Sequence, residues 1–219
     1  MNTQPAGPNM ERPRQRMVDE QLKPRGISDP RVLDSMRAVP RHVFVDAAVA
    51  SHAYSDSSLP IGSGQTISQP YMVAKMTQLL ELQGHERVLE IGTGCGYQTA
   101  VLARLCRRVY SIERIDFLHH RARSNLRAAR SANVMLKLGD GTEGWKEYAP
   151  FDAVIATAGG QKIPSAWMEQ LRPGGVMIMP VGKGGNHTLV RRRKLREGYR
   201  EEKFDTCVFV PLVSGMLNV

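Results

Sequence analysis

The residues best suited to chemistry are an acid followed by alternating glycines, namely Glu90, Gly92, Gly94 and Gly96. The apolar run at residues 88–91 predicts a buried strand, and the residues after the glycines predict a helix. In an open α/β sheet, a strand–turn–helix unit of this kind places a ligand at the carboxyl end of the strand. The glycines let the backbone approach that ligand closely. The Glu90 carboxylate would attract a positively charged group.

A dinucleotide site is the first alternative for this turn. The dinucleotide fingerprint requires a third glycine at its sixth position, and that position is Tyr97 here. A carboxylate just before the turn would also repel a pyrophosphate. The pattern therefore favours a ligand that carries positive charge and no phosphate.

A second stretch of small polar residues lies at positions 65–74. Thr66, Ser68 and Gln69 precede Pro70, and proline is a good first residue of a helix. Taken alone, this composition is typical of a turn and a helix cap. If the segment lines a site, its hydroxyls and the free N–H groups of the helix start can hold a carboxylate.

The two stretches together resemble a known family. The acid and glycine pattern resembles motif I of the class I S-adenosylmethionine-dependent methyltransferases, and residues 60–74 with residues 88–100 look very like protein-L-isoaspartate O-methyltransferase of the bacterial type. The resemblance extends over about residues 17–215. It implies S-adenosyl-L-methionine as the methyl donor, and isoaspartyl-containing proteins and peptides as substrates. These would be methylated on the α-carboxylate as a step of protein repair.

The resemblance also implies roles for the site residues. Ser68 is expected to be catalytic by donating a hydrogen bond to the substrate carboxylate, and Thr66, Ile67 and Gln69 are expected to help bind it. Glu113 follows a predicted strand at the place where an acid accepts ribose hydroxyls in nucleotide folds. Asp140 occupies the position that would bond the adenine amino group. The expected cofactor-binding residues are Glu90, Gly92, Thr93, Gly94, Gly96, Glu113, Asp140, Gly141 and Tyr71.

The implied reaction needs little acid–base help, because a carboxylate is already ionised at neutral pH. We therefore expect no general base, no metal and no covalent intermediate. Cys95, inside the glycine turn, is expected to be a small turn residue rather than a nucleophile. Residues 157–160 read Thr-Ala-Gly-Gly, where the family often has Thr-Ala-Ala-Pro, so roles in this loop are left open.

The elements that must position these residues follow an α/β order. Hydrophobic spacing predicts a helical segment over residues 13–49, an extended loop at 54–61, and helices from residue 70, at 117–132 and at 163–171. Strands are predicted at 109–113, 134–138 and 151–156, with a fifth within 171–182 and an antiparallel pair at 189–194 and 204–212. With the resemblance, the fold class is α/β and Rossmann-like, as in class I methyltransferases. It has a mostly parallel central sheet, helices on both faces and a C-terminal antiparallel strand pair.

Length and composition favour one domain. Residues 1–16 are polar, rich in proline and basic, and we expect a disordered tail there. Residues 17–219 are expected to form a single domain, with an N-terminal helical segment at 17–60 and the Rossmann-like core at 61–219. No apolar run approaches the roughly 20 residues of a membrane span.

The net charge of +9 raises the question of nucleic acid. The basic run at residues 191–194 has no interleaved aromatic residues, as a base-stacking groove would need, so a solvated basic surface is favoured. Three cysteines without metal spacing fit a reducing cytoplasm, and we expect a monomer. Two alternatives stay open. One is a related class I methyltransferase acting on RNA or a small molecule, and the other is a non-catalytic S-adenosylmethionine-binding module.

Overall fold

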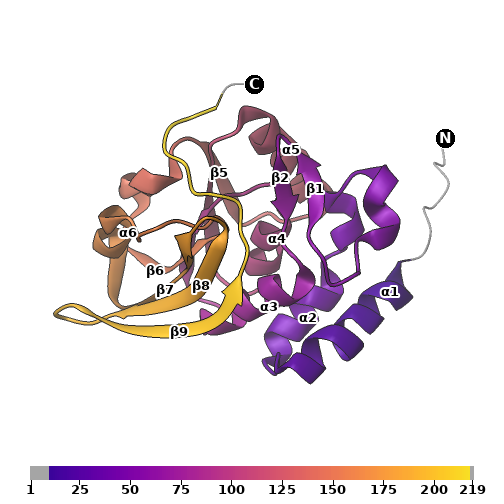
Figure 1. The fold of residues 1–219 in the computed structure, drawn as a ribbon, viewed down its shortest axis with the longest axis horizontal. Coiled ribbons are helices and arrows are strands. Elements are labelled where there is room, and N and C mark those ends of the chain that lie inside the picture. The colour runs from indigo at the N-terminus through magenta and orange to yellow at the C-terminus, as the bar shows by residue number, and fades with distance from the viewer. Residues whose placement is uncertain (1–9, 218–219) are drawn as a thin grey trace.

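The computed structural model describes residues 10–217. Its centre is a seven-stranded sheet in the order β5-β4-β3-β6-β7-β8-β9 (Figure 1). The first five of these strands run parallel, while β8 and β9 are antiparallel additions at one edge. The strands of the sheet are β3 (Arg87–Ile91), β4 (Arg108–Glu113), β5 (Val134–Leu138), β6 (Phe151–Ala156), β7 (Leu171–Lys183), β8 (Asn186–Lys194) and β9 (Tyr199–Cys207).

Alternation along the strands buries both faces of the sheet. On β3, Val88 packs into one hydrophobic cluster and Leu89 into another, because successive side chains of a strand point to opposite faces. Helices α2, α3, α4 and α5 contribute to the first cluster, and α6 with Trp145 and Trp167 contributes to the second. The helices are α1 (Glu11–Arg16), α2 (Pro30–Ala38), α3 (Pro70–Leu79), α4 (Tyr97–Ala103), α5 (Asp116–Ala128) and α6 (Ser165–Gln170). The predicted fold class, with its mostly parallel sheet and C-terminal antiparallel strands, is confirmed.

The N-terminal segment is more ordered than its composition suggested. Residues 11–16 form helix α1, which continues into a π-helical turn over Met17–Leu22, so the predicted tail is wrong for these residues. The earlier part of that tail, residues 1–9, lies outside the described residues. Met17 and Leu22, in the π-helical turn, are fully buried, and their packing explains why this part of the chain is helical. Asp29 caps α2 as its position before Pro30 indicates, because its carboxylate accepts the Arg31 N–H at 2.8 Å.

A small hairpin replaces the predicted loop before α3. Strand β1 (Leu59–Gly62) pairs antiparallel with β2 (Gln65–Ile67) in a sheet of its own. Residues 62–64 all have positive φ, which makes the tight turn. Leu59 and Ile61 are buried while their neighbours are exposed. This alternation is the signal of a strand, but it covers too few residues to stand out in the sequence.

The last strand also ends earlier than predicted. The β8–β9 ladder stops at the pair His187 and Cys207, because β8 itself begins only one residue before His187. Residues 208–213 therefore leave the sheet. They cross its carboxyl edge and form an isolated bridge between Gly159 and Pro211. The antiparallel pair is correct, but residues 208–212 are not part of it.

Candidate active site

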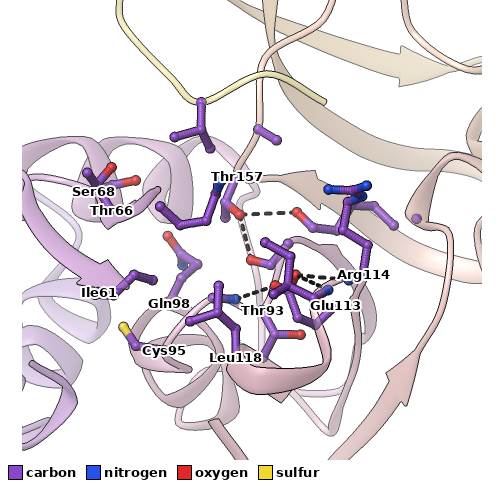
Figure 2. A pocket seen from close by; sticks show the side chains of 18 of the residues that line it. Ile61, Thr66, Ser68, Thr93, Cys95, Gln98, Glu113, Arg114, Leu118 and Thr157 are labelled. Carbon is purple, nitrogen blue, oxygen red and sulfur yellow. Dashed lines mark hydrogen bonds between the residues drawn. The ribbon is translucent and has the colours of Figure 1, made fainter. Parts of the chain in front are cut away.

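The pocket lies where the strand order reverses, between β3 and its neighbours β4 and β6. This switch point is where open α/β sheets bind ligands. The glycine turn from β3 to α4 forms its floor. Gly92 has φ +92°, and the Thr157 hydroxyl donates to the Gly92 carbonyl at 2.6 Å (Figure 2). A Cβ on Gly92 would lie 2.5 Å from that hydroxyl oxygen, so the turn requires glycine there. Thr93 and Gly94 line the pocket, and their predicted contact with a cofactor stays a prediction.

Glu113 lies at the carboxyl end of β4 and reaches the same pocket. Its carboxylate accepts the N–H groups of Gly94 at 2.8 Å, Arg114 at 2.9 Å and Ile115 at 3.0 Å. Burial raises the pKa of Glu113, while these three donors act in the opposite direction. One side chain thus fixes the glycine turn to the next strand and presents carboxylate lone pairs to the cavity.

Glu90 is not among the residues that line the pocket. It is fully buried, and its Oε2 accepts the hydroxyls of Thr99 at 2.5 Å and Ser111 at 2.6 Å. Its Oε1 is buried with no partner among the described residues. Burial raises the pKa of Glu90 to about 7. Glu90 therefore lies buried beside the glycine turn and outside the pocket lining. This position gives no support to its predicted contact with the cofactor.

The turn after β5 contributes backbone atoms rather than a side chain to the wall of the pocket. Gly141 lines the pocket, and the Trp167 indole donates to its carbonyl at 2.8 Å. Asp140 accepts from the Thr142 N–H at 2.8 Å and from the Gly215 N–H at 2.6 Å. Partial burial opposes ionisation, but these bonds lower the pKa of Asp140. Both of its oxygens are engaged, and a bond from Asp140 to a ligand stays a prediction.

The hairpin builds the opposite wall. Thr66, Ile67 and Ser68 follow the turn of β1–β2 and line the pocket. Figure 2 shows Ser68 and Thr66 across the cavity from Glu113. The cavity thus has hydroxyl donors on the wall that the hairpin forms and the Glu113 carboxylate, an acceptor, on the opposite wall.

Five predicted residues are not among those that line the cavity: Glu90 and Asp140, described above, and Gln69, Tyr71 and Gly96. Gln69 is the N-cap residue of α3 and is not a lining residue. The Tyr71 hydroxyl donates to Asp205 at 3.1 Å, and the Arg25 guanidinium stacks 3.4 Å from the Tyr71 ring centroid. Tyr71 therefore belongs to a contact between α3, β9 and the N-terminal segment. Gly96 lies at the start of α4, packed on Leu126, and is also outside the lining.

The loop after β6 and the C-terminal segment close the remaining side. Thr157 and Ala158 line the pocket together with residues 210–213. Gly159 ties the two segments, because its N–H donates to the Val210 carbonyl at 2.8 Å and its carbonyl accepts the Leu212 N–H at 2.7 Å. The departure at Gly159 has a spatial reason, since a Cβ there would fall within 2.6 Å of ring atoms of buried His187.

Several lining residues were not predicted from the sequence. They are Ile61 on β1, Gln98 on α4, and Arg114, Ile115 and Leu118 around the start of α5. Arg114 and Ile115 directly follow Glu113, so the predicted end of β4 is the signal that could have found them. Ile61 could be found only by recognising the hairpin.

The lining fits a ligand with a ribose and a positive charge better than one with phosphates. A carboxylate, neutral hydroxyls, apolar side chains and Arg114 line the cavity around the glycine turn. The Arg114 guanidinium donates to the Gly215 carbonyl, while the Glu113 carboxylate accepts the Gly94 N–H of the turn itself and would repel a phosphate there. Among residues 10–217 there is no group of three or more His, Cys, Asp or Glu side chains that could hold a metal ion. The Cys95 thiol is buried, which raises its pKa, and a buried, protonated thiol is inert.

Comparison with known proteins gives one consistent result. The family model described as Protein-L-isoaspartate(D-aspartate) O-methyltransferase matches residues 12–217. The chain is 53% identical to the protein-L-isoaspartate O-methyltransferase of Trichlorobacter lovleyi over 94% of this chain and 95% of that one. It is 51% identical to the enzyme of Halorhodospira halophila over 95% of both chains.

Solved structures agree with the sequence relatives. One described as protein-L-isoaspartate O-methyltransferase matches with a TM-score of 0.84 at 27% identity, covering 93% of this chain and 67% of that one. A putative protein-L-isoaspartate O-methyltransferase from Plasmodium falciparum, solved with S-adenosyl-L-homocysteine, matches with a TM-score of 0.78 at 24% identity, over 91% and 98% of the two chains. The second comparison bears on the fold alone.

Proposed function

Because this chain belongs to the protein-L-isoaspartate O-methyltransferase family, we propose that Ser68 and Thr66 hold the α-carboxylate of an isoaspartyl residue for methylation in the pocket described above. The enzyme transfers a methyl group from S-adenosylmethionine to that carboxylate. The methyl ester then cyclises more readily than the free acid, which returns the chain towards normal aspartate. The observation that carries the assignment of residues is the position of the two hydroxyls, facing Glu113 across one cavity.

The proposed division of the pocket follows its polar groups. S-adenosylmethionine, when bound, supplies an electrophilic methyl group on a sulfonium. Glu113 would accept the ribose hydroxyls, and Thr93, Gly94 and Gly141 would line the path of the cofactor. On the hairpin side, the Ser68 hydroxyl would donate to one oxygen of the substrate carboxylate and so aim the other at the methyl group.

Catalysis in this arrangement rests on positioning. The attacking carboxylate is already ionised, and the step neutralises one negative and one positive charge. The protein therefore needs to align the two groups and to remove water from between them. The apolar residues Ile61 and Leu118 line the same cavity and would serve the second purpose.

The test is methyl transfer from labelled S-adenosylmethionine to a pair of peptides, one isoaspartyl and one normal aspartyl. We expect base-labile label on the isoaspartyl peptide alone. A hydrogen bond to a charged group contributes roughly 1.5–3 kcal/mol, so Ser68→Ala should lower kcat/KM by about ten- to a hundredfold. Ser63→Ala, in the exposed turn of the same hairpin and outside the pocket, is the matched control and should keep full activity. Equal loss in both variants would refute the role given to Ser68.

Nucleic acid stays an unfavoured partner in this proposal. Arg191 pairs with Glu81 and Glu202, and Arg192 pairs with Glu201, so the basic run is largely neutralised by its own neighbours. Within residues 10–217, no helix is long and apolar enough to cross a membrane. The cysteines Cys95, Cys106 and Cys207 are free thiols, which supports a reducing compartment such as the cytoplasm. The monomeric state remains a prediction that light scattering can check.

A further inference from the structure

Arg41 is a fully buried arginine just outside the pocket. It opens the 3₁₀ turn Arg41–Phe44 and has no exposed surface. Its Nε donates to the Ala53 carbonyl and its Nη2 to the Ser68 carbonyl, each at 2.7 Å. Its Nη1 is buried and has no partner among the described residues.

No acid within residues 10–217 forms an ion pair with this guanidinium. The ion pairs of the described residues do not include Arg41. The ionisable groups that favour its charged form are the phenols of Tyr97 and Tyr54 and the thiol of Cys95. Burial lowers the pKa of Arg41, but an arginine side chain remains protonated in proteins. A buried charge is normally paired, because leaving it unpaired is costly. The counter-charge is therefore supplied by a group other than the described residues, or the unpaired charge lowers the stability of the fold.

The cation lies directly behind the hairpin wall. It holds the backbone of Ser68, the residue proposed to bind the substrate, and its guanidinium carbon lies 4.8 Å from the ring centroid of Tyr97. Ser68, Tyr97 and Cys95 all line the pocket. Only the first layer of the wall thus separates Arg41 from the cavity.

We propose that Arg41 is a positioning residue for the isoaspartyl carboxylate: it fixes the Ser68 backbone, and its unpaired charge beneath the hairpin attracts the anionic form of the substrate. This inference rests on the proposed function and deepens it. The substrate carboxylate is the counter-charge that the folded chain lacks.

The chemistry of the reaction makes this attraction selective. The carboxylate oxygen forms a bond to the methyl carbon while the carbon–sulfur bond of the sulfonium breaks, so the carboxylate charge disappears in the product ester. Arg41 therefore favours the substrate over the product. Arg41 also stabilises the bound substrate at least as much as the transition state, because the substrate carboxylate has already lost part of its charge in the transition state. Its removal should raise KM much more than it lowers kcat.

The test compares two peptides that differ only in charge. One carries the isoaspartyl α-carboxylate and the other carries the α-carboxamide at the same position. Binding of each to the enzyme saturated with S-adenosylhomocysteine is measured for the wild type, Arg41→Met and Arg41→Lys. Arg87→Met is the matched control, because Arg87 also donates to backbone carbonyls and faces an aromatic ring, Tyr110, but lies at the amino end of β3.

We expect the wild type to prefer the carboxylate over the carboxamide. Arg41→Met should lower that preference about 30-fold, as for the loss of a unit charge about 8 Å away at an effective dielectric constant of about 20. Arg41→Lys should keep most of the preference, and Arg87→Met should keep all of it. The affinity of Arg41→Met for S-adenosylhomocysteine should stay within about threefold of the wild type.

Three results would overturn the proposal. Equal weakening of both peptides would make Arg41 a structural residue only. A loss of cofactor affinity with unchanged peptide selectivity would show that the Arg41 charge acts on cofactor binding and not on the substrate carboxylate. Equal binding of the two peptides by the wild type would refute the proposal. This outcome needs no variant, so the proposal can be tested even if Arg41→Met does not fold. Absence of methyl transfer to the isoaspartyl peptide by the wild type would instead refute the proposed function, and the two failures are distinguishable.

Discussion

Glu90 should make the enzyme less stable as the pH rises, and Glu90→Gln should remove that effect. The acid is fully buried on β3, where two hydroxyls satisfy one carboxylate oxygen and the other oxygen has no partner among the described residues. Glutamine has nearly the same shape as protonated glutamate but cannot ionise. The substitution therefore isolates the effect of the charge on the free energy of unfolding.

The sign and size follow from the pKa. Burial raises the pKa of Glu90 from 4.5 to about 7, so below pH 4.5 both the folded and the unfolded chain carry the proton and no penalty exists. Between 4.5 and 7 the unfolded chain loses the proton first, and the stability of the wild type falls with rising pH. Above pH 7 the penalty is complete at about 3 kcal/mol, which is the shift converted at about 1.4 kcal/mol for each pKa unit.

Urea unfolding at pH 5 and pH 8, followed by tryptophan fluorescence, measures the effect. At pH 5 part of the penalty is already present, so the advantage of Glu90→Gln over the wild type should grow by about 2–3 kcal/mol between pH 5 and pH 8. Other titrating groups are common to both proteins and cancel in the difference. Glu197→Gln, at an exposed position in the β8–β9 turn, should show no such growth. A pH-independent difference for Glu90→Gln would refute the reasoning.

The remaining predictions concern the walls of the pocket. Gly159→Ala should destabilise the protein by about 1–3 kcal/mol, because its methyl group would overlap the buried ring of His187; His187→Ala in the same chain should restore part of the loss in thermal unfolding. Glu113→Ala should weaken S-adenosylhomocysteine binding at least 30-fold in calorimetry, because the three backbone N–H groups that donate to the Glu113 carboxylate would lose their acceptor. An affinity within threefold of the wild type would contradict this. Tyr71→Phe should leave cofactor affinity unchanged, since its hydroxyl bonds Asp205 outside the pocket.

The strands and the glycine turn could be predicted because their signals are local. A run of apolar residues covered on both faces identifies β3, β4 and β6 directly, and the turn glycines after β3 need conformations that other residues avoid. The same holds for the start of α2, where Asp29 and Pro30 form a cap that requires no distant partner.

The positions that the sequence left unsettled are those where distant contacts decide the structure. Glu90 looks like a ligand in the sequence, but its depth is set by Ser111 on the neighbouring strand and Thr99 on α4. Tyr71 follows Ser68 by only three residues, yet the first turn of α3 directs its ring towards Arg25. The role of Gly159 depends on His187, which is 28 positions away, and no local pattern connects them.

The C-terminal residues have a consequence for the synthesis of the chain. Residues 210–213 form one wall of the pocket, and the Gly215 N–H bonds Asp140 while its carbonyl accepts from Arg114. A nascent chain that has completed all the parallel strands still lacks these groups. Since domains are made from their N-terminus onwards, the pocket lacks this wall until residues 210–215 have left the ribosome. The full stability that cofactor binding provides is therefore gained only after residues 210–215 have been added.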